Sequence, residues 1–93
     1  MDALHVGSYG QPVIVMLSLD GDPWDLRGVP VSFEFEKPSG QKVTVQAEGG
    51  NGKATYITEK GLVTEGGMWT CEVTIDIDAK TRYVRTFSIP VVE

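Results

Sequence analysis

The stretch Trp69-Thr70-Cys71-Glu72-Val73-Thr74-Ile75-Asp76-Ile77-Asp78 decides the fold class of this chain. Its apolar side chains occupy every second position, and polar side chains fill the positions between them. Successive side chains of a β-strand point to opposite faces, so this alternation predicts a strand with one buried and one wet face. A slip by one residue would bury the acidic side chains, and we therefore expect a well-defined register.

Comparable patterns occur along the rest of the chain. They predict further strands over Val13–Leu19, Val31–Glu36, Lys42–Ala47, Ala54–Ile57 and Tyr83–Val92. In the last of these, Tyr83 and Arg85 fall on the face of Phe87, which indicates a bulge near Arg85 or a solvent rim there. The expected inward side chains are Val31, Phe33, Phe35, Trp69, Cys71, Val73, Ile75, Phe87 and Ile89, with Ile77 on the same face of its strand.

Turn chemistry separates these strands. Lys37-Pro38-Ser39-Gly40 favours a type I turn, and Glu48-Gly49-Gly50-Asn51-Gly52 offers residues that tolerate positive φ. A short polar loop, Asp78-Ala79-Lys80-Thr81, joins the last two strands. Six or seven short strands at this spacing predict a β-sandwich or barrel. We expect an N-terminal arm over residues 1–10 and one domain over residues 11–93.

Composition narrows the classes of function. The 93 residues carry 8 Lys plus Arg against 13 Asp plus Glu, a formal charge of −5, and no basic stripe suited to nucleic acid. The single Cys71 excludes an intramolecular disulfide, and no apolar run reaches the length of a membrane span. The first residues lack the features of a secretory signal, so we expect a protein made in the cytoplasm with no membrane partner.

Few residues suggest chemistry. His5 is the one histidine and lies in the arm, and Cys71 lies on the apolar face of its strand, where a thiol is usually a core side chain. We therefore predict no enzyme activity, no catalytic residue, no metal and no cofactor. The loop with Asp22, Trp24 and Asp25 is a weak candidate for a ligand, with calcium or a sugar stacked on Trp24 as the options. The alternative is that the carboxylates form turns and that Trp24 plugs one end of the sandwich.

A candidate partner interface lies near the N-terminus. Ile14 and Met16 fall opposite the apolar face of Val13 and Val15, so one apolar side has no place in a two-layer core. Tyr9, between two glycines, offers an aromatic anchor. We expect these side chains to contact a second copy or a larger partner, and the adjoining edge strand can extend a partner's sheet by strand pairing. The alternative is that the arm folds back and covers them within one monomer.

Two stretches resemble a known family. Asp25-Leu26-Arg27-Gly28-Val29-Pro30-Val31-Ser32-Phe33-Glu34-Phe35-Glu36-Lys37-Pro38-Ser39-Gly40 and Leu62-Val63-Thr64-Glu65-Gly66-Gly67-Met68-Trp69-Thr70-Cys71-Glu72-Val73 are similar to the immunoglobulin-like domains of tailed-phage virion proteins, such as the N-terminal domain of upper baseplate proteins. The similarity covers residues 13–92, and Arg27 replaces the usual Thr or Ser of the D-L-[TS]-G turn. It implies an antiparallel immunoglobulin-like β-sandwich of six or seven strands.

The resemblance also implies a function. It points to a non-enzymatic structural or adaptor protein of the virion, made in the host cytoplasm, in the baseplate, neck, fibre attachment or capsid decoration. Its partners would be other virion proteins, and it would form a homo-oligomer in the particle. The alternative from a different class is a carbohydrate-binding or adhesin module that uses Trp24 and Tyr9.

The segment before the long strand resembles a second pattern. Glu65-Gly66-Gly67-Met68-Trp69-Thr70-Cys71 is similar to the D-x-G-x-Y-x-C corner of immunoglobulin domains, with Trp69 at the aromatic position. In those domains the tyrosine hydroxyl bonds to the backbone a few residues upstream. We expect the Trp69 indole N–H to serve similarly. The chain has no second cysteine for an inter-sheet disulfide.

Overall fold

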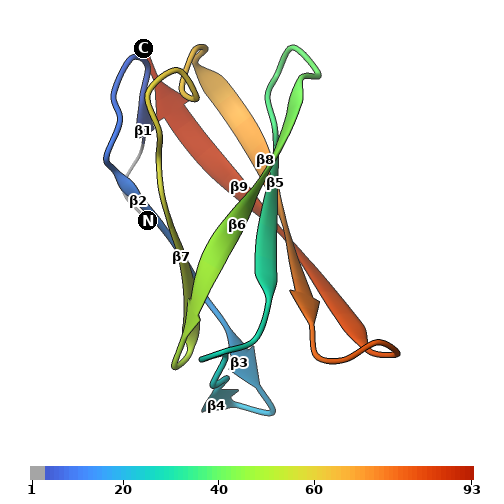
Figure 1. Cartoon of the computed structure of the whole chain (residues 1–93). Helices are drawn as coiled ribbons and strands as arrows, with labels where there is room; N and C mark the ends of the chain where they lie inside the picture. The colour runs from blue at the N-terminus through green and yellow to red at the C-terminus, as the bar shows by residue number, and fades with distance from the viewer. Residues whose placement is uncertain (1–3) are drawn as a thin grey trace.

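The computed structural model describes residues 4–93, and these form an all-β structure without a helix (Figure 1). The strands are short at the N-terminal end of the chain and longest at the C-terminal end. Their bounds are β1 Leu4–His5, β2 Pro12–Met16, β3 Ser18–Leu19, β4 Asp22–Pro23, β5 Val31–Glu36, β6 Lys42–Gly50, β7 Lys53–Ile57, β8 Gly67–Asp76 and β9 Arg82–Val92.

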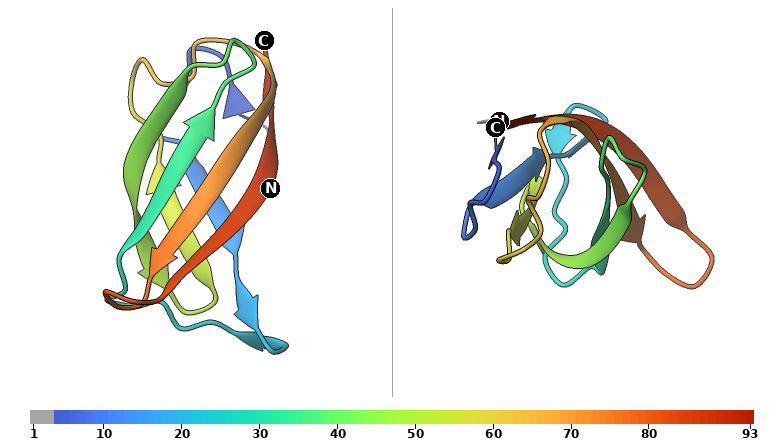
Figure 2. Two further views of the ribbon diagram at one scale, coloured as in Figure 1. Left: turned by 90° about the vertical axis from the view of Figure 1, so that its right-hand side faces the viewer. Right: turned by 90° about the horizontal axis from the view of Figure 1, so that it is seen from above.

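Seven of the strands form one sheet that curls around the core, in the order β1-β9-β8-β5-β6-β7-β2 (Figure 2). The long strand β6 produces the curl, because its residues 42–47 pair with β5 and its residues 48–50 pair with β7. All these pairs are antiparallel except β1 with β9, which is parallel. The expectation of an entirely antiparallel sheet is therefore wrong at this pair.

The parallel pair results from the path of the N-terminal segment. Leu4 is buried in the core, and the Val6 N–H continues the pairing by donating to the Val92 carbonyl at 2.9 Å. The chain then crosses to the other end of the sheet, where the Gly10 N–H donates to the Thr58 carbonyl at 2.7 Å. Within the arm expected over residues 1–10, residues 4–10 thus pack against the domain, and residues 1–3 lie outside the described residues.

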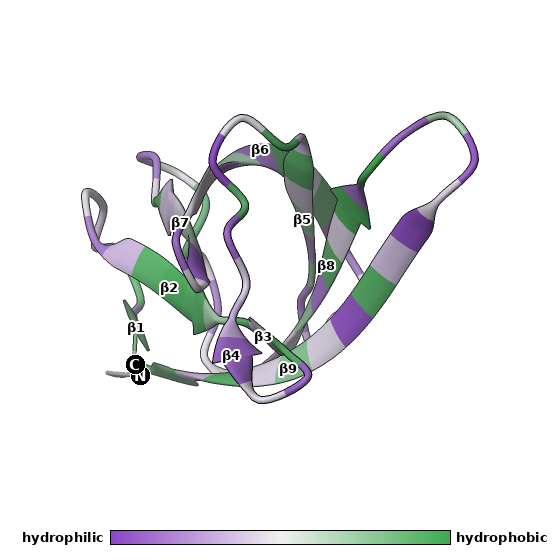
Figure 3. Ribbon diagram, turned by 90° about the horizontal axis from the view of Figure 1, so that it is seen from below, coloured by the Kyte–Doolittle hydropathy of each residue, from purple (hydrophilic) through white to green (hydrophobic). Residues whose placement is uncertain are grey.

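The core contains the residues that alternation placed inward, except Phe87. Trp69, Phe33 and Phe35 are the largest fully buried side chains, and both Phe33 and Trp69 contact the Phe35 ring edge-on, with centroids 6.0 and 6.3 Å away. Hydrophobic and hydrophilic residues follow one another along β9 (Figure 3), although Val84, one of its hydrophobic residues, is 45% exposed. The other fully buried large side chains are Leu26, Ile75, Ile89, Val13, Val15, Val31, Val73 and Cys71.

Two side chains expected to face inward, Ile77 and Phe87, are not fully buried, and the strand expected over residues 13–19 ends early. Ile77 is 41% exposed because β8 ends at Asp76 and the chain turns into the loop. Leu19 is 40% exposed because the expected strand over residues 13–19 breaks at Leu17, after which β3 turns into a small hairpin with β4. Phe87 is only half-buried.

The β8–β9 hairpin contains no bulge. Its register runs without interruption from Gly67 opposite Val91 to Asp76 opposite Arg82. Tyr83 is half-buried and Arg85 is exposed, with its guanidinium 5.9 Å from the Tyr83 ring centroid. The bulge is therefore wrong, and the alternative of a solvent rim is confirmed.

The two predicted turns differ in outcome. In Lys37–Gly40 the Gly40 N–H donates to the Lys37 carbonyl at 2.8 Å, as the turn requires. By contrast, the segment 48–52 is mostly strand, because β6 continues to Gly50. Gly49 is not at positive φ; a Cβ atom there would lie 2.2 Å from the Leu26 carbonyl oxygen. Glycine is needed at Gly49 for close approach of two backbones rather than for a turn.

Candidate functional site

The outer face of β2 and β7 carries exposed apolar side chains. Ile14 is 38% exposed, Met16 71% and Ile57 52%, while Val13 and Val15 point into the core. The register places Pro12 opposite Ile57 and Met16 opposite Lys53. We call Ile14, Met16 and Ile57 the β2–β7 face.

Tyr9 lies close to this face in the backbone path. It is 61% exposed and precedes Gly10, which bonds to the residue after Ile57. Structure and sequence thus agree that Tyr9, Ile14 and Met16 are accessible in one copy of the chain. The segment 4–10 folds back, as the alternative supposed, but it leaves these side chains exposed.

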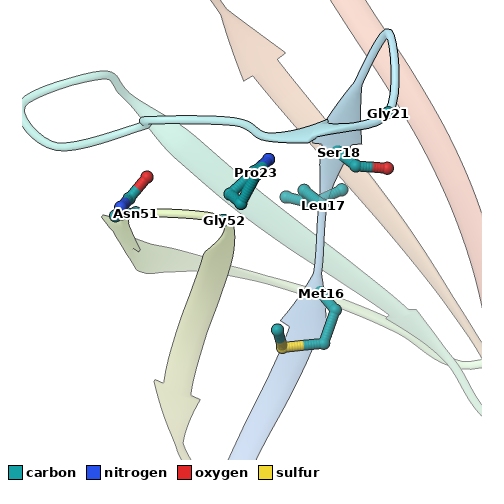
Figure 4. Close-up of a pocket in the computed structure, with 7 residues that line it drawn as sticks. All are labelled: Met16, Leu17, Ser18, Gly21, Pro23, Asn51 and Gly52. Carbon is teal, nitrogen blue, oxygen red and sulfur yellow. The ribbon is translucent and has the colours of Figure 1, made fainter.

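A pocket of about 330 Å³ adjoins the β2–β7 face at the end of β2 (Figure 4). The β3–β4 hairpin stands beside it, and this hairpin turns at Asp20 and Gly21, both at positive φ. Asp-Gly is a strong signal for such a turn. The pocket is lined by Met16, Leu17, Ser18, Gly21, Pro23, Asn51 and Gly52, with apolar atoms from Met16, Leu17 and Pro23.

The carboxylates of the loop with Asp22, Trp24 and Asp25 do not converge on one site. Asp25 is held by Arg27, which donates from Nη2 to Oδ2 at 2.7 Å and from Nε to Oδ1 at 2.9 Å. These hydrogen bonds lower the pKa of Asp25 to about 2. Asp22 lies on β4 in the hairpin. Within residues 4–93, no group of three or more His, Cys, Asp and Glu side chains is placed to hold a metal ion.

Trp24 contributes to the end of the core. Its ring is half-buried and meets the Tyr83 ring edge-on, with centroids 5.0 Å apart. Its backbone is fixed on both sides, because its N–H donates to the Leu17 carbonyl and its carbonyl accepts from the Gly52 N–H. Trp24 thus closes one end of the core, and only part of its indole is left for stacking on a sugar.

The two groups considered for chemistry lie apart from the pocket. Cys71 is fully buried, and burial raises the pKa of its thiol to about 12. A thiol of this kind is not a nucleophile at neutral pH. His5 lies on β1 with an exposed side chain.

Sequence reasoning did not identify Lys37 as a buried side chain or Ile57 as part of the exposed β2–β7 face. Lys37 is only 4% exposed; its Nζ donates to Thr64 Oγ1 at 2.8 Å and lies 5.2 Å from the centroid of the Trp69 ring. The alternation of β5 was a signal for it, since Lys37 follows Phe35 by two positions. Ile57 gave no such signal, because its exposure depends on which strand lies opposite.

Comparison with known proteins gives no further information: no protein-family model, no curated protein and no solved structure matches this chain. Residues 4–93 contain no helix long and apolar enough to cross a membrane.

Proposed function

We propose that this chain is a non-enzymatic, immunoglobulin-like structural or adaptor module of a tailed-phage virion, which acts by protein–protein contact. The observation that carries the proposal is the β2–β7 face. Large apolar side chains gathered on one outer sheet face are typical of surfaces that a partner covers. Ile14, Met16 and Ile57 form such a group, with a pocket beside Met16.

The strand order supports the immunoglobulin-like part. In immunoglobulin domains one sheet contains strands C, F and G, and the other contains A, B, E and D. Here β5, β8 and β9 lie side by side like C, F and G. β2, β7 and residues 48–50 of β6 lie side by side like B, E and D. β6 differs, because it is one strand shared by the two layers.

The corner before β8 supports it as well. The Trp69 Nε1–H donates to the Glu65 carbonyl at 3.1 Å, four residues upstream. The tyrosine corner of immunoglobulin domains makes an equivalent bond to the backbone. The indole thus has the role that its position in the sequence pattern suggested.

The virion setting rests on the resemblance of residues 25–40 and 62–73, whose turn residues have structural roles here. The Asp25 carboxylate accepts from the Arg27 N–H at 3.1 Å, and Gly28 adopts φ +75°. Ser39 Oγ bonds to Glu65 Oε1 at 2.6 Å and so joins the two stretches. An immunoglobulin-like module with an apolar outer face suits attachment between larger virion proteins.

The setting is tested by mass spectrometry of purified particles of the phage whose genome encodes this chain. We expect the protein in fixed proportion to a tail or head component. A second experiment measures binding to those particles by co-sedimentation. Met16→Asp should abolish binding, whereas Gln46→Asp, an exposed position on β6, should not. Absence from the particles, or equal binding by both variants, would contradict the proposal.

The carbohydrate-binding alternative has its own test. An array of glycans probed with the wild-type protein, Trp24→Ala and Tyr9→Ala should give no signal that depends on either ring. Binding that was lost with Trp24→Ala in a folded protein would favour the alternative.

A further inference from the structure

A second apolar group lies on the outer face of β8 and β9. Met68 is 60% exposed and Val92 45%, and Met68 lies directly opposite Pro90, which is also exposed. We call Met68, Pro90 and Val92 the β8–β9 patch. Alternation explains its position, since the neighbours Trp69, Ile89 and Val91 point into the core.

The two apolar groups belong to different parts of the curled sheet. β8 and β9 are near one end of the strand order, whereas β7 and β2 form the other end. They also lie toward opposite ends, because Met68 is near the start of β8 whereas Met16 is the last residue of β2, beside the β3–β4 hairpin (Figure 1). A contact between two different surfaces is heterologous, so it generates a ring or an open filament rather than a closed dimer.

We propose that the β8–β9 patch of one copy docks on the β2–β7 face of the next, with Met68 entering the pocket beside Met16. This rests on the proposed function of the β2–β7 face and names its partner as a second copy of this chain. A flexible thioether is suited to a pocket of irregular shape. The pocket of about 330 Å³ has room for such a side chain, and Met16, Leu17 and Pro23 offer it apolar contacts.

Lys53 beside the β2–β7 face and Glu72 beside the β8–β9 patch carry opposite charges. Lys53 lies opposite Met16 on the outer face of β7 and takes part in none of the ion pairs among residues 4–93. On β8, the acid Glu72 follows Met68 on the same face and lies directly opposite Glu34. Like charges in this position destabilise a sheet, so a cation from another copy would relieve them.

The area required is a modest part of the surface. A stable contact takes about 800 Å² from each partner, which is about one-seventh of the 5628 Å² exposed by the chain. Met68 and Met16 would be at the centre of such a contact, where most of the binding energy is concentrated, with polar side chains around them.

Cysteine cross-linking tests this arrangement. The native Cys71 does not react in this assay, because it is fully buried. Met16→Cys and Met68→Cys are prepared separately, one of them with a size tag, and are treated with a short bismaleimide alone and as an equal mixture. The mixture should give a tagged–untagged dimer several-fold above the product of either variant alone. Lys80→Cys, an exposed position in the loop between β8 and β9 and at the opposite end of this hairpin from Met68, replaces Met68→Cys as a control and should give no such increase. Circular dichroism confirms that each variant is folded.

Two results would overturn the inference. One is efficient cross-linking of Met16→Cys to itself, which indicates a symmetric contact. The other is a mixture no more reactive than the wild-type protein at any concentration tested. If either result occurs while Met16→Asp still abolishes binding to particles, the proposed function stands and its partner is a different virion protein.

Discussion

Replacement of Gly49 and of its neighbour Gly50 by alanine should have very different effects on stability. Both lie in β6 at ordinary φ, so the same methyl group is added to the same strand. At Gly49 the new Cβ would lie 2.2 Å from the Leu26 carbonyl oxygen, 1.2 Å inside the 3.4 Å at which ordinary contact begins. At Gly50 the nearest atom is Cγ of the flexible Lys53, at 3.4 Å.

The cost at Gly49 comes from a displacement that the core resists. Leu26 is fully buried, and its N–H donates to the Gly50 carbonyl at 2.9 Å. Overpacking costs about 1–3 kcal/mol, and loss of one hydrogen bond adds roughly 0.5–1.5 kcal/mol. Gly49→Ala should therefore lower the free energy of unfolding by about 2–4 kcal/mol. Gly50→Ala should leave it unchanged or raise it by up to about 1 kcal/mol, because alanine restricts the unfolded chain.

Thermal unfolding followed by circular dichroism measures the difference. At about 4–8 °C per kcal/mol for a domain of this size, a gap of about 2 kcal/mol separates the two midpoints by roughly 8–16 °C. Urea unfolding gives the free energies directly. Equal midpoints for the two variants would refute the close approach of β6 to Leu26.

Three further outcomes are expected. Cys71 should not react with a thiol reagent at pH 8 in the native protein and should react fully in denaturant, because burial raises the pKa of its thiol to about 12; reaction in both states would contradict its burial. The Asp25 carboxyl should titrate by NMR near pH 2. Since its pKa is lowered on folding, its contribution to stability is present above the ordinary pKa and is lost as the pH falls toward 2; Arg27→Ala should return the midpoint to the ordinary range. Phe33→Ala should cost about 3–5 kcal/mol and Glu34→Ala less than about 0.5 kcal/mol, and equal costs would show that the register of β5 is wrong.

Alternation correctly predicted the buried residues in the middle of the strands, because the direction of a side chain depends only on its position along its own strand. A side chain two positions from a buried one faces the same way, so Trp69, Cys71 and Ile75 could be placed inward from the sequence. The end of a strand depends instead on its partner. Pairing of β8 with β9 stops at Asp76, and Ile77 therefore leaves the face that its spacing indicated.

The glycines show a second limit of prediction from the sequence. Gly49 and Gly52 lie in one run of the sequence, and both were read as turn formers. Gly52 does adopt φ +78°, whereas Gly49 is required because the Leu26 backbone approaches it. That approach joins residues far apart in the chain, and no local pattern reports it. Similarly, Ile57 belongs to the β2–β7 face only because β7 pairs with β2.

The same pairing explains why a partner should cover the face of β2 rather than extend its edge. β2 is the last strand of the sheet, and the Gln11 carbonyl accepts from the N–H of Thr58, the residue that follows β7. Backbone groups alternate in direction along a strand, so those of Pro12, Ile14 and Met16 point to the free edge. Pro12 has no N–H to offer there, as is typical of protected edges. An added strand would find donors at only two positions, whereas the side chains of Ile14 and Met16 are both exposed on the outer face. The strand pairing expected from the sequence is therefore the weaker of the two modes, and side-chain packing on the β2–β7 face is the stronger.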